Sequence, residues 1–467
     1  MKQFDVVVLG AGSAGELIAK TLSKAGRSVA LIEKLRVGGE CAYVSCIPSK
    51  AMLRSTQIRK LAKNTVAFGA SSTPLIMDSD NEAFHWSAAR RDRIADYRDD
   101  SASSAAVKAA GIALFRGSGF VTGPNLISIN QLELGWKDLV IATGSLSTIP
   151  KIEGLETVDS WTSDEALSAG DCPRSVLIIG GGPVGCELAQ IFTRFGSETT
   201  LVQSGPQLAD QEHFDVAARL AENLEDDGVT ILLNTEVLKV ELATENQILV
   251  HLSSGSYCIV EKIIIASGRH PDTTNLGLGI LGIELDKKGT VLIDEHCRVV
   301  GQRHVWAAGD VTGIAPFTHT ASYQGHIVTS NLLGMEQVAN YVAIPRAIYT
   351  DPPVASVGKM ANSMNREGYL TASIDLKDVS RTVTDGEAGG LLVLTADPVR
   401  GVLIGASAIG PHADEWMAEA SLAIRAEIQL SLWCDVVHAF PTYGQAFETP
   451  LKELASQIFT ELLPLIA

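Results

Sequence analysis

Two cysteines, Cys41 and Cys46, lie five residues apart in the run GGECAYVSCIPSK and have the spacing of a redox-active disulfide. Zinc sites instead use shorter pairs such as C-x2-C with a second pair or histidines further along, and no such partner set follows here. Positions five apart on a regular helix are roughly 8–9 Å apart, beyond the ~7 Å that a disulfide spans, so a helix must begin or distort between them. Pro48 suits a first helical turn. Two buried structural thiols remain the alternative at this point.

The segment before these cysteines, FDVVVLGAGSAGELIAKTLSKAGRSVALIEK, has the order strand, G-x-G-x-x-G, helix, strand and acid. Gly10 permits the tight turn, Gly12 the approach of a pyrophosphate, and Gly15 close helix packing. Glu33 is placed to accept hydrogen bonds from ribose hydroxyls. The complete pattern predicts a dinucleotide-binding unit.

The same pattern returns in SVLIIGGGPVGCELAQIFTRFGSETTLVQS, where Gly180, Gly182 and Gly185 take the three glycine places. The position that corresponds to Glu33 is Gln203, an amide in place of a carboxylate. A site for the 2′-phosphate of NADPH normally needs arginine nearby, yet residues 203–213 contain neither arginine nor lysine. Neither nicotinamide cofactor is excluded, and NADH is slightly favoured.

The composition limits the class of protein. A chain of 467 residues with 46% hydrophobic residues should fold into about three domains. The net charge of −17 argues against nucleic acid and anionic lipid as partners. No apolar run reaches the ~18 residues of a membrane span, and no export signal precedes the first strand. Seven cysteines, an odd and low number, favour a reducing cytoplasm.

Two nucleotide units plus a cysteine pair suggest a flavin that passes electrons between a nicotinamide and a disulfide. With four further motifs, the whole chain resembles the class I FAD-dependent pyridine nucleotide-disulfide oxidoreductases, which include dihydrolipoamide dehydrogenase, glutathione reductase and mercuric reductase. The four motifs are VIATGS at 140–145, IIIASGRHPDT at 263–273, WAAGDVTG at 306–313 and YTDPPVASVG at 349–358. Pro-Ser-Lys at 48–50 is closer to the dihydrolipoamide dehydrogenase and mercuric reductase branches.

The resemblance implies an α/β fold with two Rossmann-like domains and a C-terminal α+β dimerisation domain. The FAD-binding domain is expected at residues 1–150 and 270–343, the NAD(P)-binding domain at 151–269, and the dimerisation domain at 344–467. The expected state is a homodimer. The expected cofactors are FAD and NAD(P)H, with no metal.

The resemblance also assigns roles to residues. Cys46 becomes the sulfur beside the flavin and Cys41 the sulfur that exchanges with substrate, while Lys50 lies near flavin N5 with Glu187 as its acidic partner. Asp310 is expected to bind the ribityl chain. The segment from Asp310 onward aligns without gaps with the family stretch D-V-T…M-L-A-H-K-A…G, which places Phe317, Thr318 and His319 along the flavin. The other expected cofactor-binding residues are Gly10, Gly12, Ala14, Gly15, Glu33, Lys34, Gly39, Gly117, Thr143, Gly144, Ser145, Gly180, Gly182, Pro183, Val184, Gly185, Gln203, Gly268, Arg269 and Gly309.

The C-terminal segment departs from the family pattern H-x-H-P-T-x-x-E. Phe440 replaces the histidine that serves as acid/base, and Gln445 replaces its glutamate. Losing such assistance typically costs about 10²–10⁴-fold in rate. His438 and Tyr443 are the two available substitutes, and the sequence does not decide between them.

The residues of the redox loop and the positions of the other cysteines limit which electron acceptor is expected. Tyr43 and Ser45 replace the usual asparagine and glycine near the cysteines, so the acceptor pocket is expected to differ. Mercuric reduction is not expected, because it depends on a C-terminal cysteine pair and no cysteine follows Cys434. Five cysteines show no pairing pattern and are expected in the core: Cys172, Cys186, Cys258, Cys297 and Cys434.

The favoured function is hydride transfer from NAD(P)H to FAD, then electron flow through Cys46 and Cys41 to a small disulfide or another acceptor. Dihydrolipoamide is the nearest candidate that the family offers. One alternative is a diaphorase that reduces quinones directly from the flavin, with a vestigial or regulatory disulfide. A non-catalytic FAD-binding scaffold is the other alternative, which the retention of Lys50, Glu187, Cys41 and Cys46 disfavours.

Overall fold

The computed structural model describes residues 1–244, 246–359, 368–386 and 389–466, with side chains to residue 458. These residues form two compact units, each assembled from three separated segments of the chain. The first unit comprises Met1–Pro48, Arg90–Thr148 and Gly268–Asn340, and the second comprises Ser49–Ala89, Ile149–Ser267 and Tyr341–Ala467. Two helices run across the boundaries between these segments: α3 (Cys46–Lys63) and α4 (Asp80–Ile94).

The first unit is built on a mixed sheet in the order β3-β2-β1-β6-β5-β4, with β17 also pairing with β6. The strands β3, β2, β1, β6 and β17 run parallel, whereas β4 and β5 form an antiparallel extension. The β-strands are β1 (Lys2–Leu9), β2 (Val29–Glu33), β3 (Ala113–Arg116), β4 (Phe120–Gly123), β5 (Leu126–Ile129), β6 (Leu132–Ile141), β7 (Ser145–Ser147), β16 (Arg269–Pro271) and β17 (Val305–Ala307). Its helices are α1 (Ser13–Lys24), α2 (Gly39–Tyr43), α5 (Ser101–Ala109) and α9 (Thr318–Leu332), with short 3-10 turns η1 (Asp96–Arg98), η3 (Leu278–Leu281) and η4 (Asp310–Thr312).

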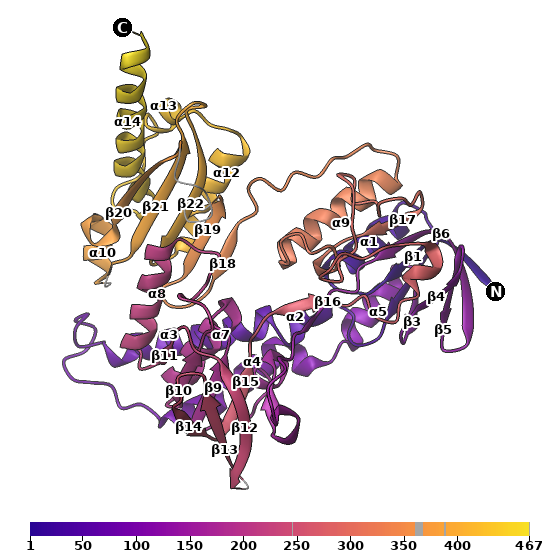
Figure 1. Cartoon of the computed structure of the whole chain (residues 1–467), viewed down its shortest axis with the longest axis horizontal. Helices are drawn as coiled ribbons and strands as arrows, with labels where there is room; N and C mark the ends of the chain where they lie inside the picture. The colour runs from indigo at the N-terminus through magenta and orange to yellow at the C-terminus, as the bar shows by residue number, and fades with distance from the viewer. Residues whose placement is uncertain (245, 360–367, 387–388, 467) are drawn as a thin grey trace. The chain divides into compact units, whose positions relative to one another are not determined.

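Apolar side chains on the two faces of this sheet form separate cores. One core joins alternate residues of β1, such as Val6 and Val8, to Ile18 of α1 and Val328 of α9. The other face buries Val7 with the antiparallel extension. In Figure 1, α1 and α9 lie side by side against the sheet. Because α1 directly follows the parallel strand β1, its first turn lies at the carboxyl edge of the sheet, where nucleotides bind in such folds.

The second unit begins with a parallel sheet in the order β11-β10-β9-β15-β8 and an antiparallel sheet β12-β13-β14. The strands are β8 (Ser160–Trp161), β9 (Ser175–Ile179), β10 (Glu198–Val202), β11 (Thr230–Leu232), β12 (Val237–Thr244), β13 (Gln247–Leu252), β14 (Tyr257–Val260) and β15 (Lys262–Ile265). The helices are α6 (Ser163–Ala166), α7 (Pro183–Arg194) and α8 (Phe214–Asp226), with the 3-10 turn η2 (Leu155–Thr157). This arrangement repeats the β-α-β order of the first unit, as the second glycine pattern predicts.

The rest of the second unit contains an antiparallel sheet in the order β18-β19-β22-β21-β20. The strands are β18 (Arg346–Ile348), β19 (Val354–Gly358), β20 (Leu370–Asp375), β21 (Leu391–Asp397) and β22 (Val402–Ile409). The helices are α10 (Ser380–Asp385), α11 (Ala413–Trp416), α12 (Ala418–Arg425), α13 (Leu430–Trp433) and α14 (Glu448–Ile466), with 3-10 turns η6 (Leu376–Asp378) and η7 (Tyr443–Phe447). Figure 1 shows α14 alongside β20 and β21. The predicted α/β class, with an α+β C-terminal part, is confirmed.

The segment Ser49–Ala89 packs in the second unit, although it lies inside the range expected for the FAD-binding domain. Met52, Leu53 and Phe84 join the core that surrounds α7. The ring of Phe84 stacks on Phe192 with centroids 6.1 Å apart. Among the described residues, no helix is long and apolar enough to cross a membrane.

Candidate active site

The two cysteines lie on either side of a helix break, as their spacing required. Cys41 lies in α2, whereas Cys46 is the first residue of α3. The hydroxyl of Thr318, at the start of α9, donates to Cys41 Sγ over 3.3 Å and lies 3.6 Å from Cys46 Sγ. Both cysteines are half-buried. The fold thus brings both sulfurs to one hydroxyl that is more than 270 positions away in sequence.

The first glycine turn lies directly beside this loop. The amide of Gly38 donates to Ala11 O over 2.8 Å, and a Cβ on Gly39 would come within 2.8 Å of Gly12 Cα. Gly10 has a φ of +95°, and a Cβ there would meet Ala142 O at 2.2 Å. A Cβ on Gly12, in contrast, would meet nothing within 4 Å. This open backbone face at the start of α1 fits a pyrophosphate group.

Glu33 ends β2 beside the same turn and is only 8% exposed. Its carboxylate accepts from the amides of Ala11 over 2.7 Å and Leu35 over 2.6 Å. A carboxylate has about four lone-pair sites, so Glu33 can still accept from ribose hydroxyls. The amide of Gly117 donates to Glu33 O over 3.0 Å, which places this predicted residue at the same edge.

Further predicted residues of the first unit meet in a second polar cluster. The hydroxyl of Ser145 donates to Asp310 Oδ2 over 2.6 Å and accepts from Arg269 Nε over 2.8 Å. Arg269 Nη2 also donates to Glu40 Oε2 over 2.6 Å. Glu40 belongs to α2, so this cluster ties the helix that carries Cys41 to Asp310. Sequence reasoning did not single out Glu40, although it lies in the run GGECAYVSCIPSK directly before Cys41.

Asp272 is another residue that the sequence did not single out. Its carboxylate forms an ion pair with Lys34 Nζ at 2.5 Å, and its carbonyl accepts from the Thr143 hydroxyl over 2.7 Å. Two predicted residues from distant motifs therefore share one partner. Two further predicted residues, Phe317 and His319, stack on each other with ring centroids 5.2 Å apart and an interplanar angle of 8°.

The second glycine turn repeats the local geometry of the first. Gly180 has a φ of +111°, a Cβ on Gly185 would lie 1.9 Å from Gly180 O, and a Cβ on Gly182 would meet nothing within 4 Å. Gln203 Oε1 accepts from the Gly181 amide over 2.9 Å, just as Glu33 accepts from Ala11. The amide of Gln203 therefore supports the turn as the carboxylate does but brings no negative charge.

Lys50 and Glu187 form a direct ion pair within the second unit. Lys50 Nζ lies 2.9 Å from Glu187 Oε1 and 2.8 Å from Oε2. The side chain of Glu187 is 7% exposed, and it also accepts from the Tyr349 amide over 3.0 Å. The ammonium of Lys50 lies 4.5 Å from the centroid of the Tyr349 ring. Because the carboxylate is buried and has a second donor, this pair is more than a surface contact.

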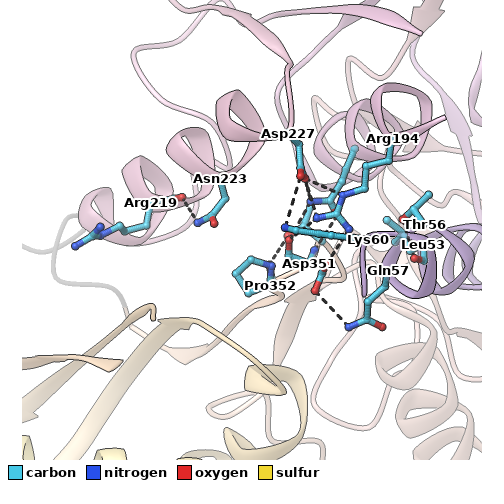
Figure 2. A network of polar contacts seen from close by, with 12 residues as sticks. Leu53, Thr56, Gln57, Lys60, Arg194, Arg219, Asn223, Asp227, Asp351 and Pro352 are labelled. Atoms are coloured by element: carbon cyan, nitrogen blue, oxygen red, sulfur yellow. Dashed lines mark hydrogen bonds and ion pairs between the residues drawn. The ribbon is translucent and has the colours of Figure 1, made fainter. Parts of the chain in front are cut away.

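A buried network holds the segment that carries Tyr349 (Figure 2). Arg194 Nη1 donates to Asp351 Oδ2 over 2.7 Å and Nη2 to Asp351 O over 3.0 Å, while Nε donates to Asp227 Oδ2 over 2.9 Å. Gln190 donates to Asp227 Oδ2 over 2.9 Å and accepts from the Asp351 amide over 2.8 Å. Glu187, Gln190 and Arg194 follow the i, i+3, i+7 spacing of one helix face. One face of α7 therefore holds the segment at residues 349–351.

The C-terminal segment places the two proposed substitute bases differently from Phe440. Phe440 is 73% exposed. His438 is nearly buried, with Nε2 3.0 Å from Glu419 Oε1 and Nδ1 3.4 Å from Glu448 Oε1. Tyr443 is also buried, and its hydroxyl donates to Asp385 Oδ2 over 3.2 Å. Within one subunit, both candidates are engaged with carboxylates.

Tyr43 of the redox loop and four cysteines of the second unit have structural roles. Tyr43 is 3% exposed, and its hydroxyl lies 3.1 Å from Ser103 Oγ, so it shapes the loop from the interior and does not line an open pocket. Burial raises the pKa of the Cys172 and Cys186 thiols to about 12, and it raises the pKa of Cys258 and Cys434 as well. These thiols are therefore unreactive near neutral pH. Among the described residues, no three metal-binding side chains gather at one point.

Comparisons with known proteins agree with this arrangement. The family model described as pyridine nucleotide-disulphide oxidoreductase matches residues 4–325, and the model of the dimerisation domain of that family matches residues 344–451. The chain is 30% identical to the mercuric reductase of Streptomyces lividans over 98% of this chain and 96% of the relative. It is also 30% identical to the dihydrolipoyl dehydrogenase of Thermus scotoductus over 98% of each chain.

A solved structure shows the same fold. The Cu(II) complex of the HOCl-induced flavoprotein disulfide reductase RclA from Escherichia coli has a TM-score of 0.85 and 25% identity, over 96% of this chain and 99% of that one. The family models together span most of the sequence, and the two relatives named above are matched over 96% and 98% of their length. The chain belongs to the pyridine nucleotide-disulphide oxidoreductases, a family of flavoproteins that bind FAD and NAD(P)H and carry a C-terminal dimerisation domain.

Proposed function

We propose that the chain passes electrons from NAD(P)H, with NADH slightly favoured, to FAD and then through Cys46 and Cys41 to a small disulfide or another acceptor. The observation that carries this proposal is the meeting of both sulfurs at the Thr318 hydroxyl, at a helix start that a disulfide requires. FAD, when bound, supplies a ring that accepts a hydride from the nicotinamide and returns an electron pair to a disulfide.

The residues of the first unit fit FAD. The open face of Gly12 suits the pyrophosphate, Glu33 the ribose hydroxyls and Asp310 the ribityl chain. The equivalent face at Gly182 suits the pyrophosphate of the nicotinamide cofactor. The other predicted binding residues are proposed to line these same two sites.

The cysteines are proposed to divide the chemistry. When an electron pair reaches the disulfide, the bond between the sulfurs breaks, and the two sulfurs hold one proton between them. Cys41 as thiolate then attacks the acceptor disulfide, forms a mixed disulfide and releases one acceptor thiolate, which takes the proton from Cys46. The Cys46 thiolate then attacks Cys41 Sγ, re-forms the internal bond and displaces the second acceptor thiolate. By the family resemblance, Lys50 is proposed to stabilise negative charge on the reduced flavin, and Glu187 orients it.

One observation favours the diaphorase alternative. Phe440, whose ring carries no proton, is exposed at the position of the family's acid/base, whereas the side chain of His438 is nearly buried. Slow thiol exchange would leave direct reduction of quinones by the flavin as the main activity. We propose a homodimer in both cases, because the dimerisation domain is present.

An acceptor panel tests the proposal. NADH oxidation is followed with lipoamide, glutathione disulfide, a quinone, Hg(II) and Cu(II), in the wild type and in Cys41→Ser. The proposed route predicts that Cys41→Ser abolishes reduction of at least one acceptor that the wild type reduces and leaves flavin reduction by NADH intact. If Cys41→Ser reduces every acceptor as the wild type does, the disulfide is not on the route and the diaphorase is correct.

A further inference from the structure

Thr318 contacts both members of the cysteine pair, although its predicted role was to line the flavin. Its hydroxyl donates to Cys41 Sγ at 3.3 Å, and either atom can donate across the 3.6 Å contact with Cys46 Sγ. The family stretch quoted above has alanine at this position, so that stretch does not predict a hydroxyl beside the sulfurs. The three residues come from three elements, α2, α3 and α9, and all three residues lie within the first unit.

The local structure fixes the hydroxyl in this place. Thr318 is the first residue of α9, and the rings of Phe317 and His319 stack on either side of it in sequence. The body of α9 packs against α1 through buried residues such as Ala321 and Val328. Cys46 is the first residue of an 18-residue helix, a position where the helix dipole favours a thiolate.

A threonine hydroxyl has one proton to donate and two lone pairs to accept with. If it donates to Cys41, it can accept only from Cys46, which must then be the protonated thiol. The reverse arrangement, with Cys41 protonated, differs by one proton moved through the hydroxyl. In that move the Cys46 thiol gives its proton to Thr318 Oγ1 while the hydroxyl gives its own proton to Cys41, or the reverse, so the hydroxyl is unchanged.

We propose that Thr318 is a further catalytic residue, which bridges the reduced sulfurs, stabilises the Cys41 thiolate and carries a proton between Cys41 and Cys46. This inference rests on the proposed redox role of the two cysteines. The family's histidine and glutamate, which this chain replaces at positions 440 and 445, act as the base for the substrate-facing thiol. In this chain the Cys46 thiolate takes that role, because it accepts the proton of Cys41 through the Thr318 hydroxyl. The acceptor is then attacked by a thiolate that forms without an external base.

The test measures the thiols directly. The holoenzyme is reduced with dithiothreitol, freed of reductant anaerobically, and alkylated with iodoacetamide between pH 5 and 10. Modification at Cys41 is located by fragment ions in the tryptic peptide 37–50. Thr318→Val, which keeps the shape but loses the hydroxyl, should raise the apparent pKa of Cys41 by about one to two units, the size expected for one hydrogen bond to a charged group.

Alkylation of the valine variant should therefore be about 10- to 100-fold slower near pH 7 and should reach the wild-type rate at high pH. Thr318→Ser keeps the hydroxyl and should follow the wild-type profile. Thr318→Ala, the residue of the family motif, gives the same readout if the valine variant does not fold. An unchanged profile in the valine or alanine variant, or a serine variant shifted as far as valine, overturns the proposal.

The same samples separate this inference from the proposed function. Thiols that appear after dithiothreitol but not after NADH would reject the proposed electron route, while a shifted profile in Thr318→Val would still support the hydrogen bond. Thiols that appear after NADH together with an unshifted profile would keep the route and reject the role of Thr318.

Discussion

Replacing Arg194 with methionine should destabilise α7 strongly, because the change removes the cation from a buried network and leaves its two carboxylates. The side chains of Arg194 and Asp227 are 7% and 10% exposed, and that of Asp351 is 22% exposed. Methionine keeps much of the aliphatic volume of arginine, so the effect reports the lost charge and hydrogen bonds.

Breaking a buried ion pair by removing one partner typically costs about 3–5 kcal/mol. The lower end applies here, because Asp227 keeps two donors. Gln190 Nε2 lies 2.9 Å from Asp227 Oδ2, and Lys60 Nζ lies 3.6 Å from Asp227 Oδ1 (Figure 2). We therefore expect about 3 kcal/mol, which accelerates hydrogen exchange through local opening by about 100-fold or more. The measurement is hydrogen exchange by mass spectrometry on peptides that cover α7.

Arg219 on α8 provides the matched control. Its side chain is 47% exposed and pairs with Glu222 at 3.4 Å and Asp375 at 3.1 Å. Such exposed pairs contribute about 0–1 kcal/mol, so Arg219→Met should change exchange less than about fivefold. Adding Asp227→Asn to Arg194→Met should recover part of the loss, because it removes one uncompensated buried charge. If Arg194→Met exchanges no faster than Arg219→Met, the network does not stabilise α7 and this reasoning is wrong.

Three other changes test separate parts of the molecule. Phe440→His with Gln445→Glu should raise the steady-state turnover of dihydrolipoamide by about 10²–10⁴-fold, because it restores the acid/base pair. The stopped-flow rate of flavin reduction by NADH should stay unchanged. Efficient dihydrolipoamide turnover by the wild type would refute this prediction. Gln203→Glu should increase the ratio of NADH to NADPH reduction rates by repelling the 2′-phosphate, and an unchanged ratio would place the selectivity elsewhere. Burial alone would raise the pKa of Asp100, but hydrogen bonds from Arg116 and a backbone amide lower it below its ordinary 3.8. The ionised Asp100 carboxylate therefore stabilises the folded protein above about pH 4, and this stabilisation is lost at lower pH. The difference in free energy of unfolding between wild type and Asp100→Asn should shrink on acidification. A difference that stays constant across pH would contradict this prediction.

The parts of the fold that were predicted from sequence have short-range causes. The two glycine turns at Gly10 and Gly180 are encoded in about 30 residues each, because the turn, the helix and the second strand follow one another. The break in the helix between Cys41 and Cys46 followed from the reach of a disulfide. Spacing and local pattern therefore predicted these elements before any tertiary contact was known.

The parts that were missed depend on residues far apart in sequence. Glu40 meets Arg269 across 229 positions, and Thr318 meets Cys41 across 277. The Lys50 and Glu187 pair was predicted from the family motifs, but the amide and ring of Tyr349 that contact it were not. The packing of Met52, Leu53 and Phe84 into the core around α7 was not predicted either, because apolar periodicity shows that a helix is buried but not which core it joins.

The central claim, that electrons from NADH reach the bond between Cys41 and Cys46, is tested most directly by counting thiols. The chain has seven cysteines, so the oxidised holoenzyme, denatured in acid and titrated with a thiol reagent, should show the seven minus the two of the disulfide, that is five. After anaerobic reduction by NADH and the same denaturation, all seven should react. The Cys41→Ser variant should give the same count before and after NADH. A wild-type count that NADH does not change, in a protein whose flavin NADH bleaches, would contradict the account.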